Sequence, residues 1–192
     1  VGGVVITRRS ASATRPPDLL FVVIDTLRGD RTSLCGHDRP TTPTLDRLKG
    51  DGWAVSCGAV SPGSWTLPSH GSFFSGQTVI DVKAHAEHGA TLAETLAAQG
   101  YQTALISGNM VLRTGWLADG FEHVSIARNF QELRGPKLVS EVSRVLAELD
   151  PDRPAFVFVN IIDPHSPYPA VPADVGWLPP QPPVHQRRFQ TN

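Results

Sequence analysis

Three runs of apolar residues predict strands that are buried on both faces. They cover Asp18–Asp25, Thr103–Ser107 and Ala155–Ile162, and none of them alternates apolar with polar positions. A strand covered on both faces has no position that faces water, so continuous apolar runs rich in β-branched residues are typical of parallel sheets.

Segments with helical spacing separate these runs. Leu138–Leu149 has apolar residues three and four apart, and Thr91–Gly100 begins with Thr and Glu at capping-box spacing and ends on glycine. Thr44–Gly52 predicts a short helix with a glycine stop, and Pro68–Phe74 predicts the opening of another. The order of these elements predicts an α/β fold with three layers, α/β/α, around a mostly parallel sheet.

Composition divides the chain into three parts. We expect a flexible N-terminal segment over residues 1–16, an α/β domain over 17–170 and a Pro-rich tail over 171–192. Hydrophobic residues make up 40% and charged residues 18% of the 192 residues, as in a globular protein. The apolar stretch Val1–Ile6 is too short for a signal sequence or a bilayer crossing, so no membrane span is expected in this chain.

Charge and cysteine content add two expectations. The net charge of -1 and the pI near 6.7 argue against a nucleic-acid partner, for which a clustered basic face would be expected. Cys35 and Cys57 are far apart and form no CxxC pair, so we expect two isolated thiols, with a single disulfide as the alternative. The cellular compartment is therefore undecided.

Two of the predicted strands end on acidic residues, Asp25 and Asp163. Ligands of open α/β sheets bind beside the carboxyl ends of the strands, which makes these carboxylates candidates for chemistry. Asp25 could bind a cation through oxygen, and the alternative is a cap on the next turn. For Asp163 the following Pro164 favours a turn.

A Ser/Pro/Gly-rich stretch, residues 61–76, contains candidate nucleophiles. Thr66 lies just before Pro68, a residue that favours the first helical turn, and Ser69 and His70 follow. A hydroxyl at a helix N-terminus suits attack on an ester because free N–H groups stabilise an anion there. The alternative is a helix cap. His165, two residues after Asp163, could contact a metal or an oxyanion, or only a loop carbonyl.

Taken together, five segments resemble the sulfatase family in order and approximate spacing. They are Leu20-Phe-Val-Val-Ile-Asp25-Thr26-Leu-Arg28, the stretch from Gly36 to Leu48, Ser64-Trp-Thr66-Leu-Pro68-Ser-His70, the stretch from Thr91 to Ala104, and Asp163-Pro-His165-Ser-Pro-Tyr168. The resemblance covers roughly residues 17–170 and implies an alkaline phosphatase-like α/β fold.

The resemblance also implies a chemistry. Asp25 aligns with a metal ligand, Thr66 with the nucleophile that also touches the metal, and His165 with a residue that approaches the transferred sulfate or phosphate. The implied cofactor is a divalent metal ion: calcium, or manganese, zinc or magnesium. The implied substrate is a sulfate or phosphate ester of a small molecule or glycan, and Thr66 and His165 are the catalytic candidates.

The sequence departs from the family at the site. Sulfatases carry Cys or Ser, oxidised to formylglycine, where this chain has Thr66, and threonine cannot form that aldehyde because its Cβ carries a methyl group. His70 replaces an Arg, and Asn109 lies in the segment where many sulfatases have Lys and His. We take His70, Asn109 and His165 as candidate substrate-binding residues.

The family's later metal ligands, an Asp with a neighbouring Asn or His, have no counterpart before the Pro-rich tail. We therefore expect the N-terminal part of a longer hydrolase and an incomplete version of the fold. Two alternatives are a degenerate family member that binds an anionic ligand without turnover, and a phospho-group transferase of the same superfamily.

Overall fold

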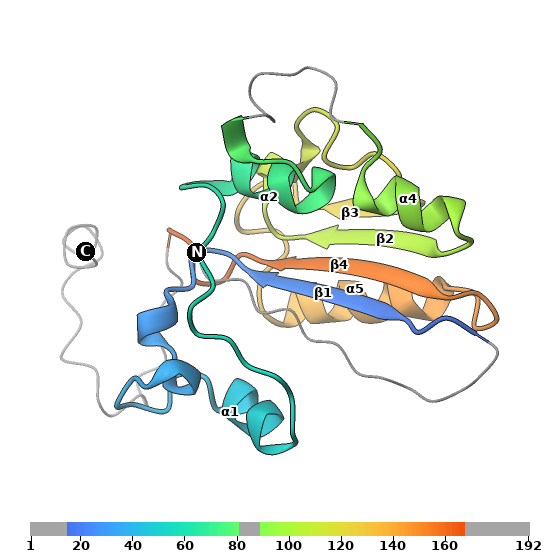
Figure 1. Ribbon diagram of the computed structural model, residues 1–192. Coiled ribbons are helices and arrows are strands. Elements are labelled where there is room, and N and C mark those ends of the chain that lie inside the picture. The colour runs from blue at the N-terminus through green and yellow to red at the C-terminus, as the bar shows by residue number, and fades with distance from the viewer. Residues whose placement is uncertain (1–14, 81–88, 168–192) are drawn as a thin grey trace.

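Four parallel strands form the centre of the protein (Figure 1). The computed structural model describes residues 15–80 and 89–167. The strands are β1 (Leu19–Ile24), β2 (Gln102–Ser107), β3 (His123–Ile126) and β4 (Ala155–Ile161), arranged in the order β1-β4-β2-β3. Most of residues 1–16 and 171–192, assigned to a flexible segment and a tail, lie outside the described residues.

Helices cover both faces of this sheet, which confirms the predicted α/β/α layers (Figure 1). On one face α2 (Thr66–Ser75) and α4 (Leu92–Ala98) pack against Phe156 and Phe158. On the other face α5 (Pro136–Glu148) packs against Val157 and Val159. Neighbouring residues of β4 thus serve opposite faces, which is why its run is apolar throughout.

The described residues also contain further short elements. They are α1 (Pro43–Gly50) and three 3-10 turns, η1 (Gly29–Arg31), η2 (Ser33–Cys35) and η3 (Met110–Arg113). The predicted capping box at Thr91 is confirmed: its hydroxyl accepts from the Glu94 N–H at 3.1 Å and its N–H donates to the Glu94 carboxylate at 2.7 Å. No helix among the described residues is long and apolar enough to cross a membrane.

Strand β3 was missed by the sequence patterns. It has four residues, and its first three, His123 to Ser125, are only partly buried or exposed because it lies at the edge of the sheet. An edge strand of this length gives no continuous apolar run.

Gly108 marks a close approach just after β2. Its N–H donates to the Asn160 carbonyl at 3.0 Å, and a Cβ at this position would lie 2.5 Å from the Leu133 carbonyl oxygen and 2.6 Å from an Ile162 methyl group. Only glycine fits between these two segments without displacing backbone.

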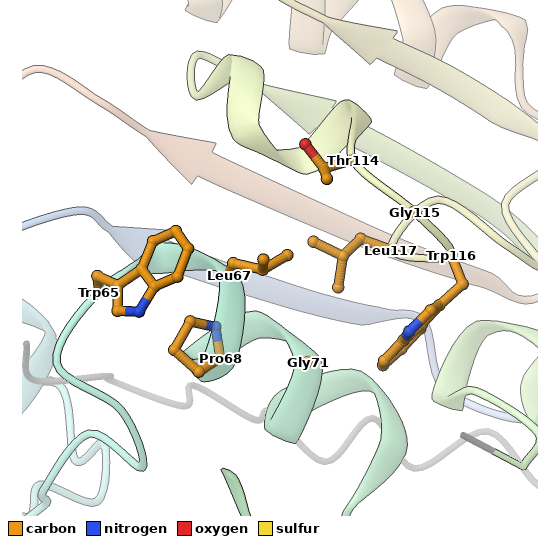
Figure 2. A pocket seen from close by; sticks show the side chains of 8 residues that line it. All are labelled: Trp65, Leu67, Pro68, Gly71, Thr114, Gly115, Trp116 and Leu117. Atoms are coloured by element: carbon orange, nitrogen blue, oxygen red, sulfur yellow. The ribbon is translucent and has the colours of Figure 1, made fainter. Parts of the chain in front are cut away.

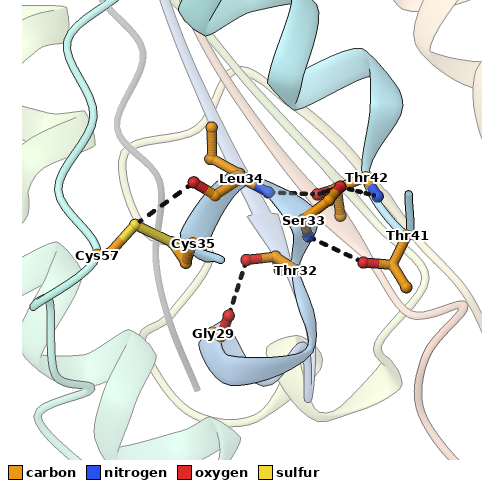
Figure 3. The surroundings of a disulfide bond; sticks show 8 residues. All are labelled: Gly29, Thr32, Ser33, Leu34, Cys35, Thr41, Thr42 and Cys57. Carbon is orange, nitrogen blue, oxygen red and sulfur yellow. Dashed lines mark hydrogen bonds between the residues drawn. A yellow bond between two sulfur atoms is a disulfide. The ribbon is translucent and has the colours of Figure 1, made fainter. Parts of the chain in front are cut away.

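A disulfide joins Cys35 to Cys57, so the expectation of two isolated thiols was wrong (Figure 3). Cys35 ends η2, and Cys57 lies on the segment that leads from α1 to α2. The two cysteines are 22 residues apart in sequence, and their Cα atoms are 5.6 Å apart because the chain turns back through α1. A pair with no local spacing signature depends on the fold and cannot be read from the sequence.

The disulfide predicts a dependence of stability on oxidation. Closing a loop of this length should contribute about 3 kcal/mol to the free energy of unfolding, so Cys57→Ser should lower it by up to that amount. Denaturant unfolding with and without reductant measures the effect. In Cys35→Ser/Cys57→Ser the reductant should change nothing further. Two free thiols in the denatured, unreduced wild-type protein would contradict the pairing.

Candidate active site

Buried polar side chains gather at the carboxyl ends of three neighbouring strands. Asp25 directly follows β1, Asn160 is the next-to-last residue of β4, and Asn109 lies two residues after β2. Their exposed fractions are 4%, 0% and 1%. Since β1, β4 and β2 are adjacent and parallel, their carboxyl ends meet at one edge, the position where α/β sheets bind ligands.

Asp25 is held in a fixed position after β1. Its N–H donates to the Ile161 carbonyl at 2.8 Å, which extends the β1–β4 ladder by one residue. The next residue, Thr26, has a φ of 57°, a left-handed conformation that a β-branched residue rarely adopts. The strained turn directs the chain away from the sheet directly after the carboxylate.

Thr66 is the first residue of α2, and Asn109 binds its side chain. The Asn109 amide donates to Thr66 Oγ1 at 3.0 Å and to Asp25 Oδ2 at 2.7 Å. Asn109 is itself fixed, because its Oδ1 accepts from the Val111 N–H and its N–H donates to Ser107 Oγ. The candidate metal ligand, nucleophile and substrate contact are therefore adjacent.

His70 also contacts Thr66, at the backbone carbonyl and not at the hydroxyl. Its Nδ1 lies 2.9 Å from the Thr66 carbonyl oxygen, and because that oxygen can only accept, Nδ1 carries the proton. Nε2 is then free to accept from the Asn160 amide at 3.3 Å. Burial lowers the pKa of His70, against the opposing effects of the Thr66 carbonyl and the Asp25 charge, so the imidazole is neutral.

Asn160 closes these contacts into a ring, although no motif in the sequence points to it. Its amide Nδ2 lies between His70 Nε2 and Asp25 Oδ2, 3.5 Å from the latter. We call Asp25, Asn109, Thr66, His70 and Asn160 the Asp25 ring. The signal in the sequence is one amide inside the otherwise apolar run from Ala155 to Ile162, which cannot be satisfied by water there.

His165 lies on the loop after β4 and makes no hydrogen bond to the Asp25 ring. Its ring stacks on Phe130 at 5.2 Å between centroids, and its carbonyl accepts from the Arg134 guanidinium at 2.8 Å. Asp163 lies in a turn, as expected, because the His165 N–H donates to the Ile162 carbonyl at 2.8 Å. The Asp163 side chain accepts from the Gly135 N–H at 2.8 Å, next to the start of α5. Tyr168, the last residue of the Asp-Pro-His segment, lies outside the described residues.

An apolar pocket adjoins the start of α2 (Figure 2). It has a volume of about 280 Å³, and its lining is Trp65, Leu67, Pro68, Gly71, Thr114, Gly115, Trp116 and Leu117. Thr66 and His70 share one side of α2 while Leu67 and Gly71 share the next, as residues four apart do. The pocket and the Asp25 ring therefore lie on different sides of the same helical turn.

A model of the Sulfatase family matches residues 17–192. The chain belongs to the sulfatase family. A search of the curated proteins finds no match. The solved structure of BT4656, in complex with its substrate D-glucosamine-2-N,6-O-disulfate, is similar with a TM-score of 0.60 and 20% identity, over 79% of this chain and 35% of that one.

A protein in the alkaline phosphatase superfamily from Vibrio parahaemolyticus is also similar, with a TM-score of 0.47 and 21% identity, over 82% of this chain and 43% of that one. This sulfatase-family chain thus spans about a third of the length of BT4656. The likeness to BT4656 confirms the predicted fold and leaves the residue roles as predictions.

The side-chain oxygens next to Asp25 in this sulfatase-family chain could supply only some of the ligands of a metal ion. Asp25 Oδ2 accepts from two amides, whereas no hydrogen bond reaches Oδ1 from the described part of the chain. A carboxylate and the Thr66 hydroxyl are oxygen ligands of the kind that hard cations take, but such ions want about six. Residues 15–80 and 89–167 contain no group of three or more His, Cys, Asp or Glu that could hold a metal ion.

The buried His70 predicts how stability depends on pH. Unfolded His70 titrates near its ordinary pKa of 6.5 and folded His70 below it, so between the two values the unfolded chain binds more protons. The contribution of His70 to the free energy of unfolding is fully present above pH 6.5. Between pH 6.5 and the pKa of folded His70, the free energy of unfolding falls by about 1.4 kcal/mol for each pH unit. Thermal melts from pH 8 to 5 should show a steeper loss for wild type than for His70→Asn. Equal slopes for wild type and His70→Asn would mean that a group other than His70 causes the loss of stability at low pH.

Proposed function

We propose that this chain is the nucleophile-bearing part of a metal-dependent hydrolase of sulfate or phosphate esters. The observation that carries the proposal is the shared Asn109 amide, which donates both to the Thr66 hydroxyl and to the Asp25 carboxylate. A hydroxyl, a carboxylate and an amide donor at one edge of the sheet are the groups that transfer of an anionic group requires.

Thr66 is the attacking group in this proposal. Its Oγ1 accepts from Asn109, and its own proton has no acceptor among the described residues, so the proton is available to leave. The free N–H groups of the first turn of α2 favour the negative charge that then develops. Because the side chain is threonine, formylglycine chemistry is absent, which favours phosphate over sulfate as the transferred group.

The proposed reaction is an in-line displacement followed by hydrolysis. Thr66 Oγ forms a bond to phosphorus or sulfur while the bond to the ester oxygen breaks and the alcohol leaves with a proton. Water then attacks the Thr66 ester and releases inorganic phosphate or sulfate and the free hydroxyl. A bound divalent cation would lower the pKa of the hydroxyl and balance the charge of the transferred group, with Asp25 and Thr66 among its ligands.

Other residues bind and orient the substrate. Both hydrogens of Asn109 Nδ2 are donated, to Thr66 Oγ1 and to Asp25 Oδ2, so an oxygen of the transferred group would bind here by replacing one of these two acceptors. His165 lies on the loop after β4, with its ring against Phe130, and is the second candidate contact. Both nitrogens of His70 are engaged inside the protein, which favours a role in holding Thr66 over direct contact with substrate. BT4656 acts on a sulfated amino sugar, and a phosphorylated or sulfated small molecule or glycan is the substrate class that we propose here.

Substitution of Thr66 tests the nucleophile. The structure does not support the alternative of a helix cap, because Trp65 is the N-cap of α2 and no side chain caps the helix. In a full-length version, Thr66→Ser should retain metal-dependent hydrolysis of an aryl phosphate or sulfate, whereas Thr66→Asn should lose kcat by several orders of magnitude, because an amide cannot attack. Ser75→Ala, which removes a hydroxyl from the other end of α2, is the matched control and should leave kcat unchanged. Activity that survives in Thr66→Asn but not in Asp25→Ala would make water the attacking group. No turnover in any variant of the full-length version would favour the non-catalytic alternative.

Metal titration tests the ligand count separately. With Asp25 and Thr66 as its ligands, the 192-residue chain should bind calcium, manganese, zinc or magnesium only weakly, with a Kd of about 1 mM or above. Isothermal titration calorimetry measures this, with Asp25→Ala expected to abolish the remaining signal and Asp38→Ala, at an exposed loop position, expected to retain it. A tight one-to-one site that Asp25→Ala removes would show that the ligand set is complete without further chain.

A further inference from the structure

Thr66 is held at two points, and both connections return to one atom. Asn109 joins its hydroxyl to Asp25 Oδ2, and His70 joins its carbonyl through Asn160 to the same Oδ2. Together they fix both the hydroxyl and the peptide group of Thr66.

We infer that Asn160 is a positioning residue: its amide holds the His70 imidazole in the orientation in which Nδ1 donates to the Thr66 carbonyl, and through His70 it holds the turn that presents Thr66. The inference rests on the proposed function in that Thr66 is taken as the attacking group. Asn160 acts indirectly, because its side chain donates to His70 and Asp25 and not to Thr66.

The orientation of the Asn160 amide carries the argument. Its neighbours on one side are two acceptors, a carboxylate oxygen and the Nε2 lone pair, so Nδ2 must face them. A reversed amide would direct its oxygen at both acceptors, and both contacts would become repulsive. The amide therefore has one favourable orientation, and that orientation excludes a proton on His70 Nε2.

The same orientation leaves Asn160 Oδ1 buried without a hydrogen-bond partner among the described residues. An unsatisfied buried acceptor destabilises a protein by about 1–3 kcal/mol. An apolar residue of similar size would avoid this loss, since the neighbours on β4 are apolar and Asp25 Oδ2 would keep its shorter bond from Asn109. A residue that lowers stability is typical of a functional position.

Two other accounts of Asn160 are distinguishable from this one. As a purely structural residue it would affect folding and not the state of His70. As a donor to Asp25 it would act without His70, but that contact is 3.5 Å long, against 3.3 Å to Nε2. The experiment therefore reads His70 directly and asks whether the effect of Asn160 depends on it.

Nitrogen-15 NMR of the imidazole rings shows which nitrogen of His70 carries the proton, and it does so whether or not the protein is active. The His70 signal is assigned by its loss in His70→Asn. Wild type should show a protonated Nδ1 and an unprotonated Nε2, and Asn160→Leu should show the two forms mixed. The matched control is Gln102→Leu, which removes a buried amide from the opposite end of the sheet and should leave His70 unchanged. A His70 signal that Asn160→Leu does not alter overturns the inference.

Kinetics of a double-mutant cycle give the second readout. Asn160→Leu should lower kcat at least tenfold with KM within twofold, and in a His70→Asn background it should lower kcat no further. Additive losses would mean that Asn160 acts without His70. These kinetics are measured in a full-length version; if its wild type shows no turnover, the proposed function fails while the NMR result still decides the role of Asn160. Asn160→Ser is the second variant, and unfolding of both, with Gln102→Leu folded, would make Asn160 structural and overturn the inference.

Discussion

The carboxylate of Asp25 must be stabilised without water, and the arrangement of the rest of the site depends on this requirement. An ionised carboxylate with 4% exposure loses most of its hydration, at a penalty of several kcal/mol unless the protein supplies donors. Two amides supply them, one from the end of β2 and one from β4. The strand order β1-β4-β2, with all strands parallel, places both amides beside the residue that follows β1.

The sequence predicts those parts of the structure that local patterns determine. The continuous runs around Phe21 and Phe158 and the capping box at Thr91 are local signals, and the structure contains all of them. The family resemblance nominated Asp25, Thr66 and Asn109, and the structure brings these three together. Their roles in catalysis remain predictions.

What the sequence could not supply is pairing over long distances along the chain. Asn160 is 90 residues from His70, and no spacing rule links an amide in a strand to an imidazole in a helix. Cys35 and Cys57 form a disulfide for the same kind of reason, since only the turn through α1 makes them neighbours. Strand β3 was missed because it has only four residues, of which only Val124 and Ile126 are apolar.

Gly108 connects the two parts of the site through one point of backbone contact. Its missing Cβ lets the end of β2, and with it Asn109, approach Leu133, and the adjoining Arg134 holds the loop that carries His165. Any side chain at 108 would push these segments apart, so the Asn109 amide and the His165 ring would move together. Residue 108 should therefore not tolerate substitution. A laboratory library that varies residues 107–109 should recover glycine at position 108 even when it is selected for folding alone.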